Sequence, residues 1–138
     1  MIGLLLVTHG EIGISLVESA TQILGAAPAQ VATLSVWRQD DPDDLMLRAR
    51  EMLEGIDAGD GALVLTDLFG ATPGNVASRL LEDGRVEGVS GVSLPMLLRV
   101  LAARNGSPKL GLAAAVQRAL SGGAEGVVHM NTDRCCDA

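Results

Sequence analysis

Two side chains able to do chemistry follow two apolar runs of the chain. His9 follows the run Ile2–Val7 with one residue between them, and Asp67 comes directly after the run Ala62–Thr66. An unperturbed imidazole has a pKa of about 6.5, so a neutral, nucleophilic ring nitrogen is available at cellular pH. A neighbouring carboxylate would fix the tautomer and stabilise the cation that forms when the other nitrogen is substituted. We predict that His9 and Asp67 form a catalytic pair. The alternatives are a histidine in a plain turn and an acid at a helix start.

The glycine-rich segment 70–74, Gly-Ala-Thr-Pro-Gly, has the features of an anion site. It offers free backbone N–H groups, a hydroxyl and the positive end of a predicted helix. The candidate phosphate-binding residues are therefore Gly70, Ala71 and Thr72, with a simple tight turn as the alternative. No Gly-Lys-Ser/Thr follows, so the segment is not a Walker A loop, and no dinucleotide fingerprint is present. These features predict that the histidine itself handles phosphoryl groups, without a nucleotide cofactor.

Alternating strands and helices must position these residues. Four short apolar runs predict buried strands at Ile2–Val7, Val31–Val36, Ala62–Thr66 and Val86–Val92. Strands separated by helices predict a doubly wound, mostly parallel sheet, and the usual order is 2-1-3-4. In that order the first and third strands are neighbours, and ligands bind in the crevice beyond their carboxyl ends. His9 and Asp67 are both expected at that crevice.

Caps, prolines and glycines predict the helices and the end of the chain. Apolar spacing predicts a first helix from Ile12 that Gly25 stops, and Asp41-Pro42 begins a second. Thr72 and Pro73 are interpreted as the cap and first residue of a helix that runs to Gly84. The last three predicted elements are a helix opened by Pro95, a helix from Ser107-Pro108 to Gly122-Gly123, and a short strand at Gly126–Met130.

Composition limits the class of protein. The 138 residues are expected to form one domain, 1–138, whose core consists of aliphatic side chains because only Trp37 and Phe69 are aromatic. Seventeen acidic against ten basic residues give a net charge of −7, which argues against nucleic acid and anionic membranes as partners. No uncharged apolar run approaches the length of about 18 residues that would span a membrane, and no signal peptide is recognisable. We therefore expect a cytoplasmic protein without direct membrane insertion.

Cysteine and histidine spacing predicts neither a disulfide framework nor a metal site. Cys135 and Cys136 are adjacent, which fits neither a framework nor a metal-binding pair. The second histidine, His129, lies far from His9 in the sequence and is interpreted as a core or interface residue.

Three segments of the chain resemble one bacterial family. Val7–Gly10 (Val-Thr-His-Gly) resembles the phosphorylation-site motif of the mannose/fructose/sorbose-class IIA components of the phosphotransferase system. Asp67–Asn75 resembles that family's Asp-x-x-Gly-Gly-Ser-Pro-x-Asn, and Gly91–Leu97 resembles its Gly-Val-Asn-Leu-Pro-Met-Leu. The motifs occur in the same order at matching spacing, and the likeness covers essentially the whole chain. Ala71 and Thr72 stand where the family usually has glycine and serine, and Ser93 replaces an asparagine.

The resemblance implies a phosphocarrier. In that family the protein HPr donates a phosphoryl group to the histidine that matches His9, and a IIB partner or other downstream acceptor receives it. The covalent phosphohistidine is the only intermediate, and no other cofactor is implied. The family fold is a homodimer that exchanges a C-terminal antiparallel strand, which Gly126–Met130 matches in position. Association with a membrane permease would be through partners.

Three alternatives remain at the level of sequence. The dihydroxyacetone-kinase phosphotransfer subunit has a related fold and the same histidine chemistry, although the three motifs fit the mannose class better. The start His9-Gly10-Glu11 resembles that of histidine phosphatases, but Thr8 stands where those enzymes need an arginine. The third alternative is a phosphate-sensing module that binds without a covalent intermediate.

Overall fold

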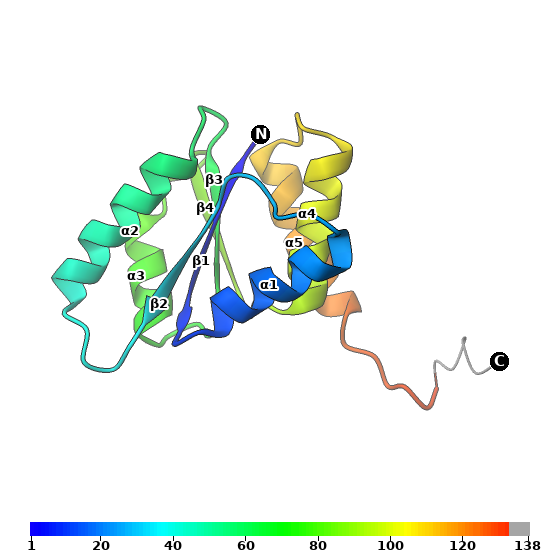
Figure 1. Cartoon of the computed structure of the whole chain (residues 1–138), viewed down its shortest axis with the longest axis horizontal. Helices are drawn as coiled ribbons and strands as arrows, with labels where there is room; N and C mark the ends of the chain where they lie inside the picture. The colour runs from blue at the N-terminus through cyan, green and yellow to red at the C-terminus, as the bar shows by residue number, and fades with distance from the viewer. Residues whose placement is uncertain (133–138) are drawn as a thin grey trace.

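The structure, a computed structural model, describes residues 1–132, so Cys135 and Cys136 lie outside the described residues. Strands and helices alternate as expected (Figure 1). The elements are β1 (Gly3–His9), α1 (Ile12–Leu24), β2 (Val31–Val36), α2 (Pro42–Ile56), β3 (Ala62–Thr66), α3 (Thr72–Leu80), β4 (Val86–Ser90), α4 (Leu94–Gly106) and α5 (Leu112–Glu125). The four strands form one parallel sheet of order β2-β1-β3-β4, which confirms the predicted topology.

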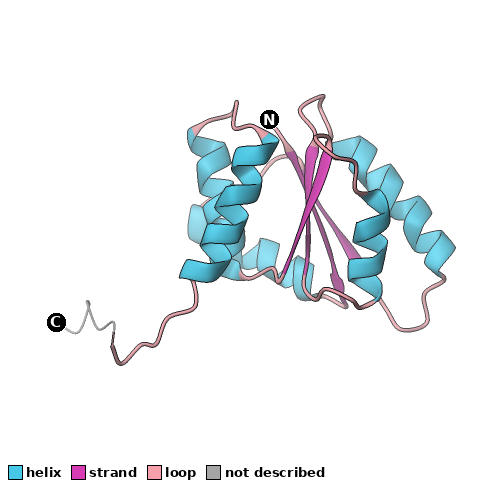
Figure 2. Cartoon of the chain, turned by 180° about the vertical axis from the view of Figure 1, so that it is seen from behind, coloured by secondary structure: helices cyan, strands magenta, loops and turns pink. Residues whose placement is uncertain are grey.

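Helices cover both faces of the sheet. Helices α2 and α3 lie on one face, while α1, α4 and α5 lie on the other (Figures 1 and 2). Side chains alternate along β1, so Leu4 and Leu6 pack against α1, α4 and α5, whereas Leu5 and Val7 pack against α2 and α3. Burial on both faces explains why the strand sequences are continuous apolar runs. Both core clusters consist of aliphatic residues and methionine, as predicted.

Strand register brings the carboxyl ends of β1 and β3 to one edge. Val7 pairs with Thr66, the last residue of β3, so β1 continues for two residues beyond this pair. On its other side, β1 pairs with β2 as far as His9 opposite Val36. His9 and Asp67 therefore emerge at the same end of two adjacent strands, as the strand order predicts.

Two helix boundaries differ from the sequence-based expectation. Helix α3 ends at Leu80 instead of Gly84, because Glu82 and Val86 form an antiparallel bridge that turns the chain into β4. Ser107-Pro108 does not begin α5, which starts at Leu112. The Ser107 N–H instead bonds to the Ala103 carbonyl, 3.0 Å away, and so closes the end of α4.

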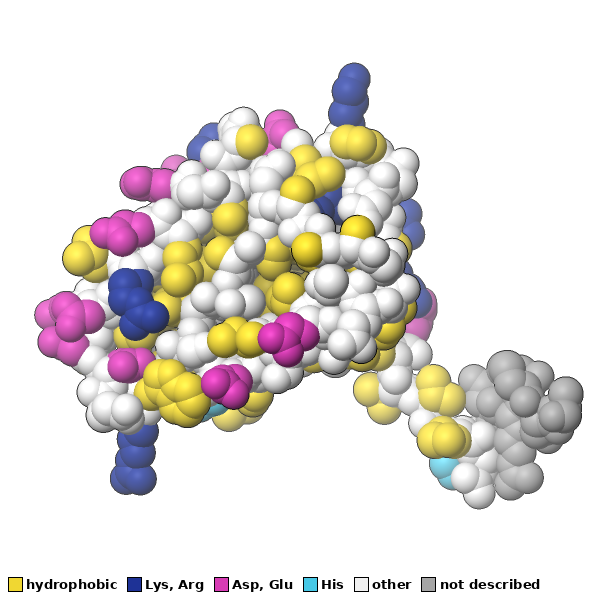
Figure 3. All heavy atoms as spheres, viewed as in Figure 1, with side chains coloured by type: hydrophobic (Ala, Val, Ile, Leu, Met, Phe, Trp, Pro, Cys, Tyr) yellow, Lys and Arg dark blue, Asp and Glu magenta, His cyan; other side chains and the backbone are white. Residues whose placement is uncertain are grey.

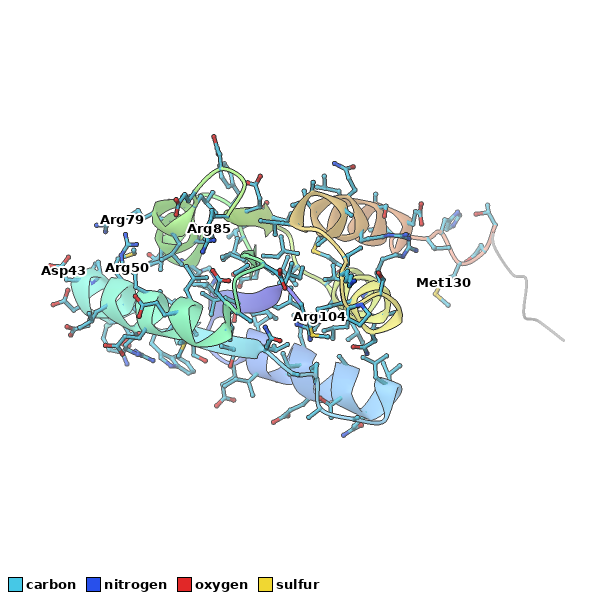
Figure 4. All side chains as sticks on the ribbon, turned by 90° about the horizontal axis from the view of Figure 1, so that it is seen from above. Asp43, Arg50, Arg79, Arg85, Arg104 and Met130 are labelled. Carbon is cyan, nitrogen blue, oxygen red and sulfur yellow. The ribbon has the colours of Figure 1, made fainter. Side chains whose placement is uncertain are left out.

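The predicted C-terminal strand is absent from the described single chain. Helix α5 runs past the expected stop to Glu125, and residues 126–132 form neither strand nor helix. A strand needs a neighbouring backbone to pair with, and this tail leaves the body of the protein (Figures 1 and 4). Its apolar side chains are exposed, with Val127 84% and Met130 79% accessible (Figure 3). His129 is also exposed and is therefore not a core residue.

Arg104 is a fully buried cation that the sequence pattern did not reveal. It projects from α4 and donates from Nη1 to the Ile2 carbonyl at 3.0 Å and from Nη2 to the Ala29 carbonyl at 2.6 Å (Figure 4). Burial lowers the pKa of its guanidinium from the ordinary value. These bonds connect α4 to the segments that precede β1 and β2. They hold the end of the sheet opposite His9.

Replacing Arg104 should therefore destabilise the fold. We expect Arg104→Leu to lower the free energy of unfolding by about 2–4 kcal/mol, because buried carbonyls that lose a donor cost about 1–3 kcal/mol each. Urea unfolding followed by circular dichroism measures this difference. The matched control is Arg118→Leu on the exposed side of α5, which should change the value by less than about 0.5 kcal/mol. Equal stability of the two variants would contradict the role given to Arg104.

Candidate active site

His9 and Asp67 form a hydrogen-bonded pair at the crevice. Asp67 Oδ2 lies 2.9 Å from His9 Nδ1 and also accepts the His9 backbone N–H at 3.1 Å. The carboxylate side chain is only 12% exposed, whereas the imidazole is 46% exposed. Because an ionised carboxylate can only accept, Nδ1 carries the proton that the pair shares, and Nε2 of the neutral ring keeps its lone pair. The geometry thus presents Nε2 as the available nucleophile.

The environment of Asp67 keeps its carboxyl ionised. Burial alone would raise the pKa, but the hydrogen bonds from the ring and backbone of His9, together with the charge of His9, outweigh it and lower the pKa below the usual value. Asp67 Oδ1 is buried and has no hydrogen-bond partner among the described residues. The stabilisation of the charged carboxylate therefore comes through Oδ2 and His9.

The turn that carries His9 is fixed on both sides. Before it, Thr8 is buried and its Oγ1 accepts the Gly13 N–H at 2.8 Å, which closes the first turn of α1. After it, the Gly10 N–H donates to the Val36 carbonyl at 2.9 Å. Gly10 has a φ of +49°, a left-handed conformation that suits glycine. The strand thus ends with the imidazole directed into the crevice.

One residue of the predicted phosphate-binding segment, Thr72, lies at the same crevice. Thr72 is exposed and lines an open cleft of about 420 Å³ together with His9. Gly70 has a φ of +88° and turns the chain after β3. Gly74 lets the start of α3 pack against the backbone of Leu68, because an added Cβ there would lie 2.7 Å from the Leu68 carbonyl oxygen.

The start of α3 corrects one expectation about Thr72. The cap position belongs to Ala71, whose extended backbone precedes the helix, and Thr72 is the first helical residue. Pro73 is tolerated in the first turn because no N–H is required there. No described residue bonds to the Thr72 hydroxyl, which is therefore not a helix cap.

Ser93, the replacement in the third motif, accepts the Met96 N–H at 3.3 Å and caps α4.

The loop after β2 is a wall of the cleft that sequence reasoning missed. Trp37, Arg38 and Asp40 line the cleft with His9 and Thr72. The strand order contained the signal, because it places β2 beside β1 and hence the carboxyl end of β2 at the same edge. Within residues 1–132, no group of three or more His, Cys, Asp and Glu side chains could hold a metal ion.

Comparison with known proteins identifies the family. The model described as "EIIA-man: PTS system fructose IIA component" matches residues 3–117. The chain belongs to this family. The EIIA-man family thus accounts for the segments around His9, Asp67 and Gly91, all of which lie within the match. No helix in the part of the chain that the structure describes is long and apolar enough to cross a membrane.

Individual relatives agree with the EIIA-man assignment. The chain is 33% identical to the fructose-specific EIIA component of Bacillus subtilis over 105 residues, which are 75% of this chain and 71% of that protein. It is 31% identical to the mannose-specific EIIAB component of Escherichia coli over 127 residues, 91% of this chain but only 38% of that longer protein. A crystal structure of an EIIA component from Streptococcus agalactiae superposes with a TM-score of 0.82 at 26% identity, covering 96% of this chain and 99% of that one.

The coupling between His9 and Asp67 predicts a pKa change. In His9→Ala the ring hydrogen bond and the histidine charge are lost while the burial remains, so the pKa of Asp67 should rise. Carboxyl-carbon NMR titration measures the midpoint. Asp57 is the internal control, because its lowered pKa depends on the N–H groups of Gly59 and Gly61 and on Arg85, not on His9. An unchanged Asp67 midpoint in His9→Ala would contradict the coupling.

Proposed function

We propose that this protein is a phosphocarrier of the phosphotransferase system that accepts a phosphoryl group from HPr on His9 Nε2. It then passes the group to a IIB component or another downstream acceptor, in sugar uptake or its regulation. The exchange takes place in the cytoplasm. The single observation that carries the proposal is the hydrogen bond between Nδ1 and the buried Asp67, which leaves Nε2 accessible and nucleophilic. Membership of the EIIA-man family supports it.

The chemistry requires one bond to form and one to break. The Nε2 lone pair of His9 attacks the phosphorus of the donor phosphohistidine, and the donor's P–N bond breaks. The ring of His9 becomes positively charged, and its Nδ1 proton remains in the hydrogen bond to Asp67. The ionised Asp67 stabilises this cation without accepting the phosphoryl group itself. Transfer to the next imidazole is the same step in reverse.

The negatively charged phosphoryl oxygens need hydrogen-bond donors next to His9. We assign this role to the Thr72 hydroxyl and the backbone N–H groups of Gly70, Ala71 and Thr72. The first N–H groups of a helix have no acceptor within the helix, and α3 begins at Thr72. Thr72 shares its cleft with His9, which supports this assignment.

The alternatives explain fewer of these features. A histidine phosphatase needs an arginine directly before its histidine, and here Thr8 fills that position with a buried hydroxyl that caps α1. A purely sensing module does not need a carboxylate bonded to the histidine. The family match over residues 3–117 favours the mannose/fructose class over the dihydroxyacetone-kinase subunit.

We also propose that the protein acts as a homodimer through its C-terminal tail. Residues 126–130 carry Val127, Val128 and Met130, and all three are exposed in the single chain. Strand β4 is an edge of the sheet, and beyond the bridge between Val86 and Glu82 its outer side has no neighbouring strand among the described residues. Pairing of the tail with the partner subunit would cover both.

Phosphorylation is the direct test of the site. With phosphoenolpyruvate, enzyme I and HPr, the wild-type protein should gain the mass of one phosphoryl group, and His9→Ala should gain none. Asp67→Asn should slow the transfer by orders of magnitude but still give an acid-labile, base-stable product, because an orienting carboxylate is lost while the nucleophile remains. Intact-mass spectrometry follows both. Undiminished labelling of His9→Ala, or a base-labile product that disappears in Asp67→Asn, would refute the assignment.

Removal of the tail tests the dimer. Deletion from Gly126 onward should convert a dimer into a monomer or an aggregate, as measured by light scattering at micromolar concentration. Helix α5 ends at Glu125, so the deletion leaves it intact. A full-length protein that is monodisperse and monomeric under these conditions would contradict exchange of the tail.

A further inference from the structure

A phosphoryl group on His9 would enter a surface with an excess of negative charge. The group itself carries about 1.5–2 negative charges at neutral pH, which the positive ring only partly balances, and the chain already has a net charge of −7. Asp40 is an acidic residue of the same cleft, so the site contains a repulsive group as well. A cation close to Nε2 would therefore stabilise the phosphorylated form. Within the described residues, Arg38 is the only Lys or Arg that lines the cleft.

Arg38 has no ion-pair partner within the described residues. Arg85 and Arg99, by contrast, form ion pairs with Asp57 at 2.9 Å and with Glu125 at 2.6 Å. Asp40 lies two positions after Arg38, but its Oδ2 accepts the Trp37 N–H at 2.8 Å. That bond closes the turn and leaves the exposed guanidinium of Arg38 available to a ligand.

The loop that carries Arg38 is fixed against the turn of His9. Val36, the last residue of β2, pairs with His9, and its carbonyl accepts the Gly10 N–H. The Trp37 ring packs on Gly10, where an added Cβ would lie 3.3 Å from the ring carbons. A second bond from the Asp40 N–H to the Trp37 carbonyl, 3.1 Å, holds the turn. The backbone that carries Arg38 is therefore held at the same edge of the sheet as His9, and both residues line one cleft.

We propose that Arg38 binds the phosphoryl oxygens of phosphorylated His9 and so stabilises the phosphorylated form of the protein; this inference rests on the proposed function. A guanidinium offers a planar fork of N–H donors that matches phosphoryl oxygens, and such charge-assisted bonds are stronger than neutral ones. The unphosphorylated imidazole offers this cation only the neutral Nε2 acceptor, with no negative charge. Arg38 therefore favours phosphoryl transfer toward this protein and opposes the return to HPr.

The phosphoryl-exchange equilibrium with HPr measures this effect. We expect Arg38→Ala to lower the equilibrium constant for transfer from phosphorylated HPr by about tenfold, the lower end of what hydrogen bonds to charged groups contribute, because the site is open to water. Arg38→Lys should recover part of the loss, since it retains the charge but not the fork. The matched control is Arg48→Ala, an exposed arginine of α2 outside the cleft, which should leave the constant unchanged.

A second measurement does not depend on HPr. Phosphoramidate phosphorylates His9 chemically: Nε2 attacks the phosphorus, the P–N bond of the reagent breaks and ammonia leaves. In ¹⁵N-labelled protein, the Nε–H resonance of Arg38 should shift on phosphorylation, whereas that of Arg48 should not. A merely structural role of Arg38 would not produce this shift.

The outcomes separate the inference from the function on which it rests. If Arg38→Ala and Arg48→Ala give the same equilibrium constant, or the Arg38 resonance does not move, the inference is wrong and the carrier function stands. If phosphoramidate labels His9 but HPr does not, the proposed donor is wrong, and the resonance shift still decides the role of Arg38. If neither reagent labels His9, both proposals are overturned.

Discussion

The pairing of β1 with β2 on one side and β3 on the other is the constraint on which the site depends. The register sets His9 opposite Val36 and Val7 opposite Thr66, so three strand ends meet at one edge of the sheet. Each strand is held by backbone hydrogen bonds and by apolar side chains on both faces. A shift of β1 by one residue would move Leu4, Leu5 and Leu6 to the opposite faces of the sheet. Their side chains would then no longer fit the two apolar clusters. The position of the imidazole is therefore fixed by the core and not by local contacts alone.

Asp67 and His9 have different environments and different roles in the pair: Asp67 accepts the hydrogen bond from the ring, and His9 presents its other ring nitrogen to solvent. The carboxylate is largely buried, which strengthens its interaction with the ring, while the imidazole stays 46% exposed. The cost of burying Asp67 is offset by the two hydrogen bonds to its Oδ2. This dependence runs in both directions, because His9 lowers the pKa of Asp67 and Asp67 orients His9.

Both aromatic residues of the chain lie at the surface and not in the core. The two apolar clusters of the core, as far as the structure describes the chain, consist of aliphatic side chains and methionine, while the two aromatic residues are exposed: Trp37 is 47% accessible and Phe69 is 76% accessible. Trp37 lies in the loop after β2 and Phe69 in the loop after β3. These two strands are the neighbours of β1, which ends at His9. Large aromatic side chains are the residues that most often anchor protein interfaces. Their exposure is consistent with a site whose substrate is carried by another protein.

The sequence by itself determined the strands, their order and the proximity of His9 to Asp67. The apolar runs, such as Ala62–Thr66, are buried on both faces, so a local pattern carries the signal for strands and, through the crossover rules, for topology. The tertiary structure alone decided which ring nitrogen bonds to Asp67, because that depends on distances between residues 58 positions apart. It also decided that Trp37, Arg38 and Asp40 join the cleft, that Thr8 caps α1 and that Arg104 is buried. These outcomes depend on register and packing between distant elements, which no local pattern of residues encodes.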